Sequence, residues 1–126
     1  MLANIPETLV TTHLVKAFDL GVNGNLYGGR MLDWLDEAGA LFVISRFQAC
    51  FVTWKIGETV FHTPVREGSI VSIYVRNVEV RHSAVGFELT ARVGDQEVVT
   101  TSMVFVCVDE KTGKKLPIPV KAAENA

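Results

Sequence analysis

The chain has few of the residues that mark several common classes of protein. Its 126 residues include only two cysteines, Cys50 and Cys107, which are far apart in apolar stretches. We expect two reduced thiols there, with a single disulfide as the alternative. Twelve Lys and Arg stand against 14 Asp and Glu, so no basic excess points to a nucleic-acid partner. No apolar run reaches the roughly 18 residues that span a bilayer, and we expect no membrane partner.

Other signals are also missing. The first residues lack a positively charged region followed by an apolar core, so we expect no secretion signal and a cytoplasmic protein. The three histidines, His13, His62 and His82, are not paired with one another or with carboxylates at metal-ligand spacing. We therefore expect neither a metal ion nor a cofactor.

What the chain does have is one long helical pattern followed by period-two patterns. At 48% hydrophobic residues, with no repeat or linker, residues 1–126 suit a single domain. One helix is predicted over 27–47. Strands are predicted over 8–18, 51–61 with an interruption near Gly57, 70–81, 85–93 and 98–108.

This order predicts an α+β domain. The connections between the later strands are short, so we expect those strands to be antiparallel neighbours. One helix covers five or six strands only if the sheet curves around it. The last predicted strand is apolar on both faces, which favours a second copy of the chain covering the outer face and hence an obligate oligomer. Its two sets of residues are Val99, Met103, Phe105 and Cys107, and Val98, Val104, Val106 and Val108.

A carboxylate inside the helix is the first candidate for function. Indexed at 100° per residue, Asp36 falls within the apolar stripe around Leu32, while Asp33 and Glu37 point away. An unpaired charge facing the interior is costly, so Asp36 needs a reason to be there. It is either a catalytic group or a carboxylate that caps or pairs with Arg46 or a neighbouring strand.

The helix start is the second candidate. Its N–H groups lack partners within the helix and carry partial positive charge, and Gly28 and Gly29 let a ligand approach them. Such an end can stabilise an oxyanion, although it can also be only a turn. Eight residues place Asp36 about 12 Å along the axis from Gly28. One carbonyl therefore reaches both groups only across a two-fold interface, an arrangement that suits acyl hydrolysis.

These segments together resemble the hotdog-fold acyl-CoA thioesterases, in the branch of bacterial acyl-CoA thioester hydrolases and cytosolic acyl-CoA hydrolases. The likeness covers nearly the whole chain. It rests on four segments: the Gly-Asn-Leu-Tyr-Gly-Gly run at 24–29 with the helix at 31–40, the connection at 61–68, the Arg-His-Ser turn at 81–83, and the strand at 100–106. The resemblance implies a hotdog fold, a curved antiparallel sheet around one long central helix, paired in dimers that often form tetramers or hexamers.

The resemblance also implies an activity and roles for residues. The protein would hydrolyse an acyl-CoA thioester to a free acid and coenzyme A without a cofactor. Asp36 would be the general base or the nucleophile, and the Gly28 N–H would polarise the carbonyl. Arg81 and Ser83 fall where the family contacts coenzyme A. The expected substrate-binding set is completed by Asn23, Asn25, Gly29, His62 and Pro64.

The chain departs from the family at Gly21, where an Asn that helps to place the thioester or the water is common. Either Asn23 or Asn25 takes over, or the rate is low, or the substrate differs. Two further readings stay open: a non-catalytic acyl-CoA binding or sensing module, and a hotdog hydratase or dehydratase. The second is disfavoured because no His lies between His13 and His62. A structural oligomer in which Asp36 satisfies a buried donor is the third alternative to the thioesterase.

Overall fold

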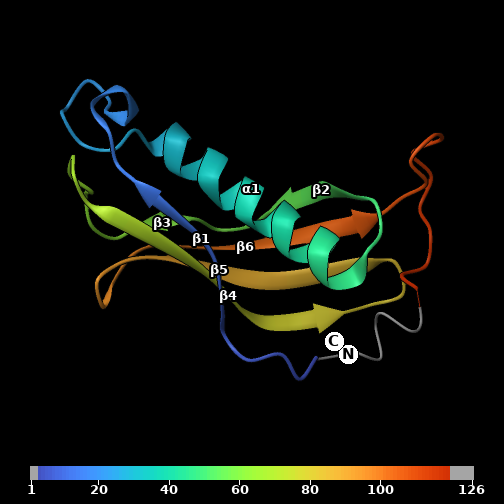
Figure 1. Cartoon of the computed structure of the whole chain (residues 1–126). Helices are drawn as coiled ribbons and strands as arrows, with labels where there is room; N and C mark the ends of the chain where they lie inside the picture. Colours follow the sequence, from blue (N-terminus) through green and yellow to red (C-terminus); the bar gives the residue numbers. More distant parts are fainter. Residues whose placement is uncertain (1–2, 120–126) are drawn as a thin grey trace.

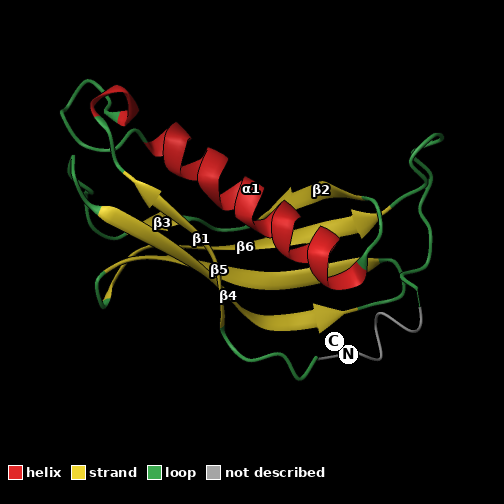
Figure 2. Cartoon of the chain, viewed as in Figure 1, coloured by secondary structure: helices red, strands yellow, loops and turns green. Residues whose placement is uncertain are grey.

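The computed structural model describes residues 3–119, in which one long helix packs on one face of an antiparallel sheet (Figure 1). The chain order is β1 (Thr8–Leu14), the 3-10 turn η1 (Ala17–Asp19), α1 (Gly28–Phe47), β2 (Phe51–Ile56), β3 (Val60–Phe61), β4 (Ile70–Val80), β5 (Ala84–Val93) and β6 (Gln96–Cys107). The six strands form one sheet. Five of them follow the order β1-β4-β5-β6-β2, and β3 pairs with β6 at Val99 and Thr100, while β2 pairs with its residues 103–107. Figure 2 shows α1 as the one long helix over the curved sheet.

The helix begins and ends where its flanking residues leave helical geometry. Tyr27 before it is extended, and Gln48 after it has a left-handed backbone with φ 52° and donates its N–H to Ile44. A left-handed residue is a common stop signal for a helix. The predicted bounds of 27–47 are confirmed to within one residue.

The buried face of α1 differs from the predicted stripe. Leu32, placed at its centre, is half-buried, whereas Leu35 and Ala38 are fully buried. The sheet therefore contacts a face centred further round the helix, and Asp36 lies at the border of that face rather than inside it. Asp36 is still the least exposed of the three acids, since Asp33 and Glu37 are exposed.

The expectation that consecutive later strands are neighbours is wrong for β2, β3 and β4. β2 is an edge strand beside β6, whereas β4 lies on the other side of β5. Residues 62–69 cross the end of the sheet near the helix start, where Val65 accepts the N–H of Leu26 at 2.7 Å and Gly68 donates to Val15 at 2.9 Å. Through these backbone hydrogen bonds the connection at 62–69 holds the helix start. β2 therefore lies at the edge of the sheet beside β6, away from β4.

The β2 edge exposes apolar side chains. Five of its six residues are exposed, including Val52, Trp54 at 64% and Ile56. In β6, Val98 and Val106 on one face are buried, as are Val99 and Phe105 on the other. The predicted two-faced apolar character of this strand is confirmed.

Aromatic packing fixes the helix on the sheet. Phe42 meets Phe87 edge to face at 5.4 Å between ring centroids, and Phe87 stacks on Phe105 at 5.7 Å. A Cβ on Gly39 would lie only 2.7 Å from the Phe105 ring, so the absent side chain lets that ring reach the helix. The part of α1 that carries Asp36 is therefore held rigidly.

Candidate functional site

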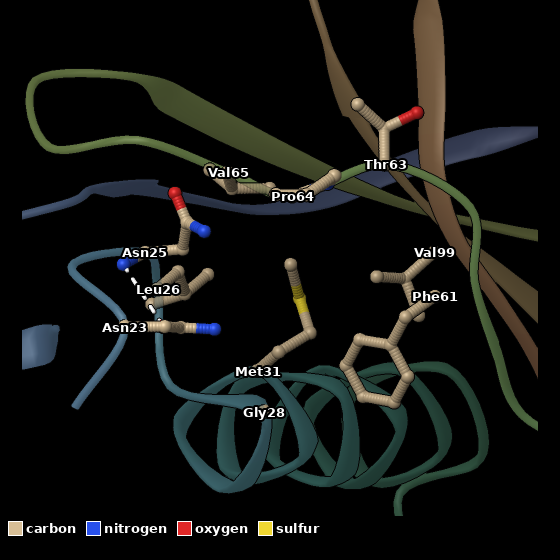
Figure 3. A pocket seen from close by; sticks show the side chains of 10 residues that line it. All are labelled: Asn23, Asn25, Leu26, Gly28, Met31, Phe61, Thr63, Pro64, Val65 and Val99. Atoms are coloured by element: carbon tan, nitrogen blue, oxygen red, sulfur yellow. Dashed lines mark hydrogen bonds between the residues drawn. The ribbon is translucent and has the colours of Figure 1, made fainter. Parts of the chain in front are cut away.

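A cavity of about 250 Å³ opens at the start of α1 (Figure 3). Its walls come from the loop before the helix, the first turn of the helix, β3 with the connection after it, and β6. The lining residues are Asn23, Asn25, Leu26, Gly28, Met31, Phe61, Thr63, Pro64, Val65 and Val99. Four of the predicted site residues are thus brought together: Asn23, Asn25, Gly28 and Pro64.

The helix start at this cavity is uncapped. The N-cap residue Tyr27 makes no side-chain hydrogen bond to the helix, and the first turn holds no acidic residue. The Phe61 ring lies 3.7 Å from where a Cβ on Gly28 would stand, so the ring covers the glycine closely. Because no side chain caps them, the first N–H groups of the helix form a small positive pole at the cavity wall.

A buried carboxylate, Asp19, holds the loop before the helix. Its Oδ2 accepts the Lys16 N–H at 2.9 Å, and its Oδ1 lies 3.2 Å from Arg30 Nε. That second contact is an ion pair, although the N–H is not aimed well enough for a hydrogen bond. The Asp19 carbonyl also accepts the Tyr27 N–H at 2.9 Å. Both ends of the loop are thereby fixed, a role that the sequence did not reveal.

Two amides form the polar end of the cavity. The Asn25 N–H donates to Asn23 Oδ1 at 3.2 Å, and the Asn25 carbonyl accepts the Gly21 N–H at 2.8 Å. With its oxygen engaged by the turn, the Asn23 amide nitrogen points over the helix start, and the Asn25 amide lies beside it (Figure 3). Gly21, the departure from the family pattern, contributes backbone only.

Asp36 lies outside this cavity, two turns along α1 and facing the β2 edge. Its Oδ1 accepts a hydrogen bond of 2.7 Å from Thr53 Oγ1. Asp36 is half-buried and Thr53 is exposed at the surface. Among residues 3–119, no ion pair joins Asp36 to Arg46, so of the two partners weighed for it the neighbouring strand is the one observed.

Gly29 and His62, two of the predicted substrate-binding residues, do not line the cavity. A Cβ on Gly29 would lie 2.5 Å from the Tyr27 ring, so the glycine makes room for that tyrosine. The exposed His62 shares a hydrogen bond of 2.8 Å between its Nε2 and Thr100 Oγ1.

Arg81 and Ser83 lie at the opposite end of the sheet, in the turn between β4 and β5 (Figure 1). The Ser83 carbonyl accepts the N–H of Cys107, whose pairing partner on β2 is Phe51, just after the end of the helix. Arg81 donates to Glu79 at 2.8 Å, and this bond lowers the pKa of the Glu79 carboxyl. One protomer therefore does not bring this pair to its own Gly28.

Within residues 3–119, no three His, Cys, Asp or Glu side chains gather in a group able to hold a metal ion. Over the same residues, no helix is both long and apolar enough to cross a membrane.

Sequence reasoning missed most of the cavity wall. Met31 belongs to the apolar pattern of the predicted helix and was not chosen as a site residue. Phe61 and Thr63 are the chain neighbours of His62 and Pro64, which were chosen in the connection at 61–68. Thr53 was missed because its link to Asp36 joins residues 17 apart. A neighbouring strand was one expected partner of Asp36, but no pattern in residues 51–56 singles out Thr53.

Comparison with known proteins places this site in a family. Residues 23–100 match the model of the thioesterase superfamily. Acyl-CoA thioester hydrolase YciA of Salmonella typhimurium is 26% identical in an alignment that covers 94% of this chain and 96% of the Salmonella protein.

Solved structures share the fold. A hexameric thioesterase from Yersinia pestis superposes with a TM-score of 0.83 at 26% identity, covering 92% of this chain and 99% of its own. A hexameric hotdog fold thioesterase of Campylobacter jejuni gives 0.83 at 26% identity, with 93% and 94% covered. The predicted hotdog fold is confirmed, and the chain belongs to the thioesterase superfamily.

Proposed function

We propose that the protein hydrolyses an acyl-CoA thioester to a free carboxylic acid and coenzyme A. The observation that carries the proposal is the uncapped helix start at Gly28, which opens on a largely apolar cavity with two amides at its polar end. An uncapped helix start stabilises the negative charge that grows on a carbonyl oxygen under attack. The names of the relatives, acyl-CoA thioester hydrolase and thioesterase, support the same reaction.

Asp36 supplies the second half of the chemistry. Its carboxylate either takes a proton from an attacking water, or attacks the carbonyl carbon itself to form a mixed anhydride that a water then hydrolyses to the free acid and the regenerated carboxylate. The bond from Thr53 fixes one carboxylate oxygen and leaves the other to face the substrate or the water. As the carbon–sulfur bond breaks, the coenzyme A thiolate leaves and takes up a proton, so that water and thioester give acid and thiol. No cofactor takes part.

The two groups meet across a dimer. Because Gly28 and Asp36 are about 12 Å apart along one helix, a single protomer does not place both on one carbonyl. Among residues 3–119, no strand pairs with the outer side of β2 beside Asp36. This edge exposes Val52, Trp54 and Ile56, as expected of a surface that a second copy covers. The carboxylate of one subunit then faces the Gly28 of the partner subunit.

The same arrangement gives Arg81 and Ser83 a role. These residues lie far from the helix start of their own chain, so they contact the coenzyme A bound in a neighbour's site. The Arg81 side chain is 68% exposed, and its guanidinium suits a phosphate. The assembly is a homo-oligomer built on the dimer, and the relatives from Yersinia and Campylobacter are hexamers.

One observation favours a second function, a binding or sensing module. Gly21 offers no side chain where the family commonly has an Asn, and its N–H is used in the turn with Asn25. If neither Asn23 nor Asn25 replaces that amide, the protein binds acyl-CoA without cleaving it.

A thiol-release assay separates these functions. Purified protein is mixed with acyl-CoA substrates and free thiol is followed with a chromogenic disulfide reagent, while coenzyme A binding is measured by calorimetry. The proposal predicts both binding and catalytic thiol release. Binding without thiol release indicates the sensor, and loss of substrate without thiol indicates a hydratase. Absence of both indicates the structural oligomer.

A further inference from the structure

The cavity at the helix start has two chemically different ends. Asn23, Asn25 and the Gly28 amide form the polar end. The side of the cavity away from these two amides is formed by Met31, Phe61 and Val99, whose side chains offer no hydrogen-bond donor (Figure 3). The one hydroxyl in the wall, on Thr63, accepts a hydrogen bond of 3.1 Å from Gln96 and points away from the cavity (Figure 3).

This division decides which part of a thioester enters the apolar end. The pantetheine arm of coenzyme A carries amides, and burying an amide without a partner is costly. An acyl chain has no such need and gains from leaving water. With the carbonyl at Gly28, the acyl group therefore occupies the apolar end and the pantetheine arm leads outward.

The apolar end is closed by residues of the core. Met31 and Val99 are each only 1% exposed. Behind them, one turn along the helix, is Leu35, and beside Val99 on β5 is its partner Ala91, both fully buried. Protein interiors are packed as densely as organic crystals, so a longer chain finds no space beyond Met31 and Val99.

The volume sets the length. At about 30 Å³ for each water-sized group, the part of the site that one protomer forms, a cavity of about 250 Å³, holds about eight such groups. The thioester carbon, oxygen and sulfur use about three of them. We propose, on the basis of the proposed thioesterase function, that this site selects acyl groups of about six carbons or fewer, with Met31 and Val99 setting the limit.

The test is a panel of straight-chain acyl-CoAs from acetyl to palmitoyl, scored by kcat/KM for thiol release. In the unmodified protein kcat/KM should rise by up to about fourfold per methylene while the chain still fits, and stop rising at about six carbons. Met31→Ala removes three heavy atoms, and each removed atom makes room for about one carbon. The acyl-chain length with the highest kcat/KM should therefore increase by about three carbons. Val99→Ala should move it by about one or two carbons, and it is the milder change should Met31→Ala fail to fold.

The matched control is Met103→Ala. Met103 is as buried as Met31 and lies on β6, but it does not line this cavity. This variant should lose stability and keep the optimum of the unmodified protein. An active enzyme that prefers palmitoyl-CoA, or an optimum that neither Met31→Ala nor Val99→Ala moves, overturns the inference alone. No thiol release from any substrate overturns the proposed function and this inference with it.

Discussion

Replacing Asp19 with Asn should destabilise the protein by about 2 kcal/mol. Asn keeps an oxygen for the Lys16 N–H, but the bond changes from a charge-assisted to a neutral one, a loss of about 1 kcal/mol. The variant also removes the partner of Arg30, 3.2 Å away. Because the arginine side chain is 40% exposed, this contact is screened by solvent and contributes about 1 kcal/mol more rather than the several of a fully buried pair.

The assay is thermal unfolding at one fixed protein concentration, since oligomers gain stability with concentration. A loss of about 2 kcal/mol should lower Tm by about 8 °C in a domain of this size. KM should rise as well, because Asp19 fixes the loop that carries Asn23 and Asn25. Asp33→Asn is the matched control: that carboxylate is 71% exposed and lies 3.6 Å from the same arginine, so Tm should hardly move. Equal Tm values for the two variants would refute the reasoning.

Three further predictions concern other contacts. Thr53→Val should lower kcat by about fivefold with KM and oligomer size unchanged, because Asp36 loses its hydrogen bond. Thr53→Ser keeps a hydroxyl and should restore kcat. An unchanged kcat in Thr53→Val contradicts the role assigned to Thr53. Gly29→Ala should cost about 1 kcal/mol in urea unfolding through its clash with the Tyr27 ring, and the cost should vanish in a Tyr27→Ala background if that contact is the cause. Hydrogen bonds from Arg92 and Arg76 hold the pKa values of Glu7 and Glu97 below the ordinary value of 4.5. These two carboxylates therefore stabilise the folded state fully above pH 4.5, and this contribution is lost as the pH falls through and below that value. Urea unfolding between pH 7 and pH 3 should show a loss about 1 kcal/mol smaller in a Glu7→Gln, Glu97→Gln variant, and equal losses would contradict the pairing.

Local patterns were enough for the elements of the fold. The period of the helix, the alternation in 70–80 and 84–93, and the Gly94 turn with φ +60° all depend on residues close in sequence. The position of β2 beside β6 was not predictable in this way. It depends on the connection at 62–69 bonding to the helix start and to Val15, which are non-local contacts.

The candidate site divides along the same line. The polar end of the cavity comes from one loop and the helix start that follows it, which hold Asn23, Asn25 and Gly28. A local sequence motif was therefore enough to predict it. Pro64 is brought to the same place by the backbone hydrogen bond of its neighbour Val65. Val99 on β6 and the Thr53 bond to Asp36 come from strands distant in sequence. Asp19 was missed because a single acidic residue in a loop belongs to no periodic sequence pattern that would predict its burial.

The most direct test of the account is thiol release by Asp36→Asn, which keeps the size of the side chain and removes its charge. The account predicts a fall in kcat/KM of about a thousandfold, the scale of a lost general base, with coenzyme A binding and oligomer size unchanged. A variant that folds, assembles and still cleaves acyl-CoA within about tenfold of the unmodified rate would contradict it.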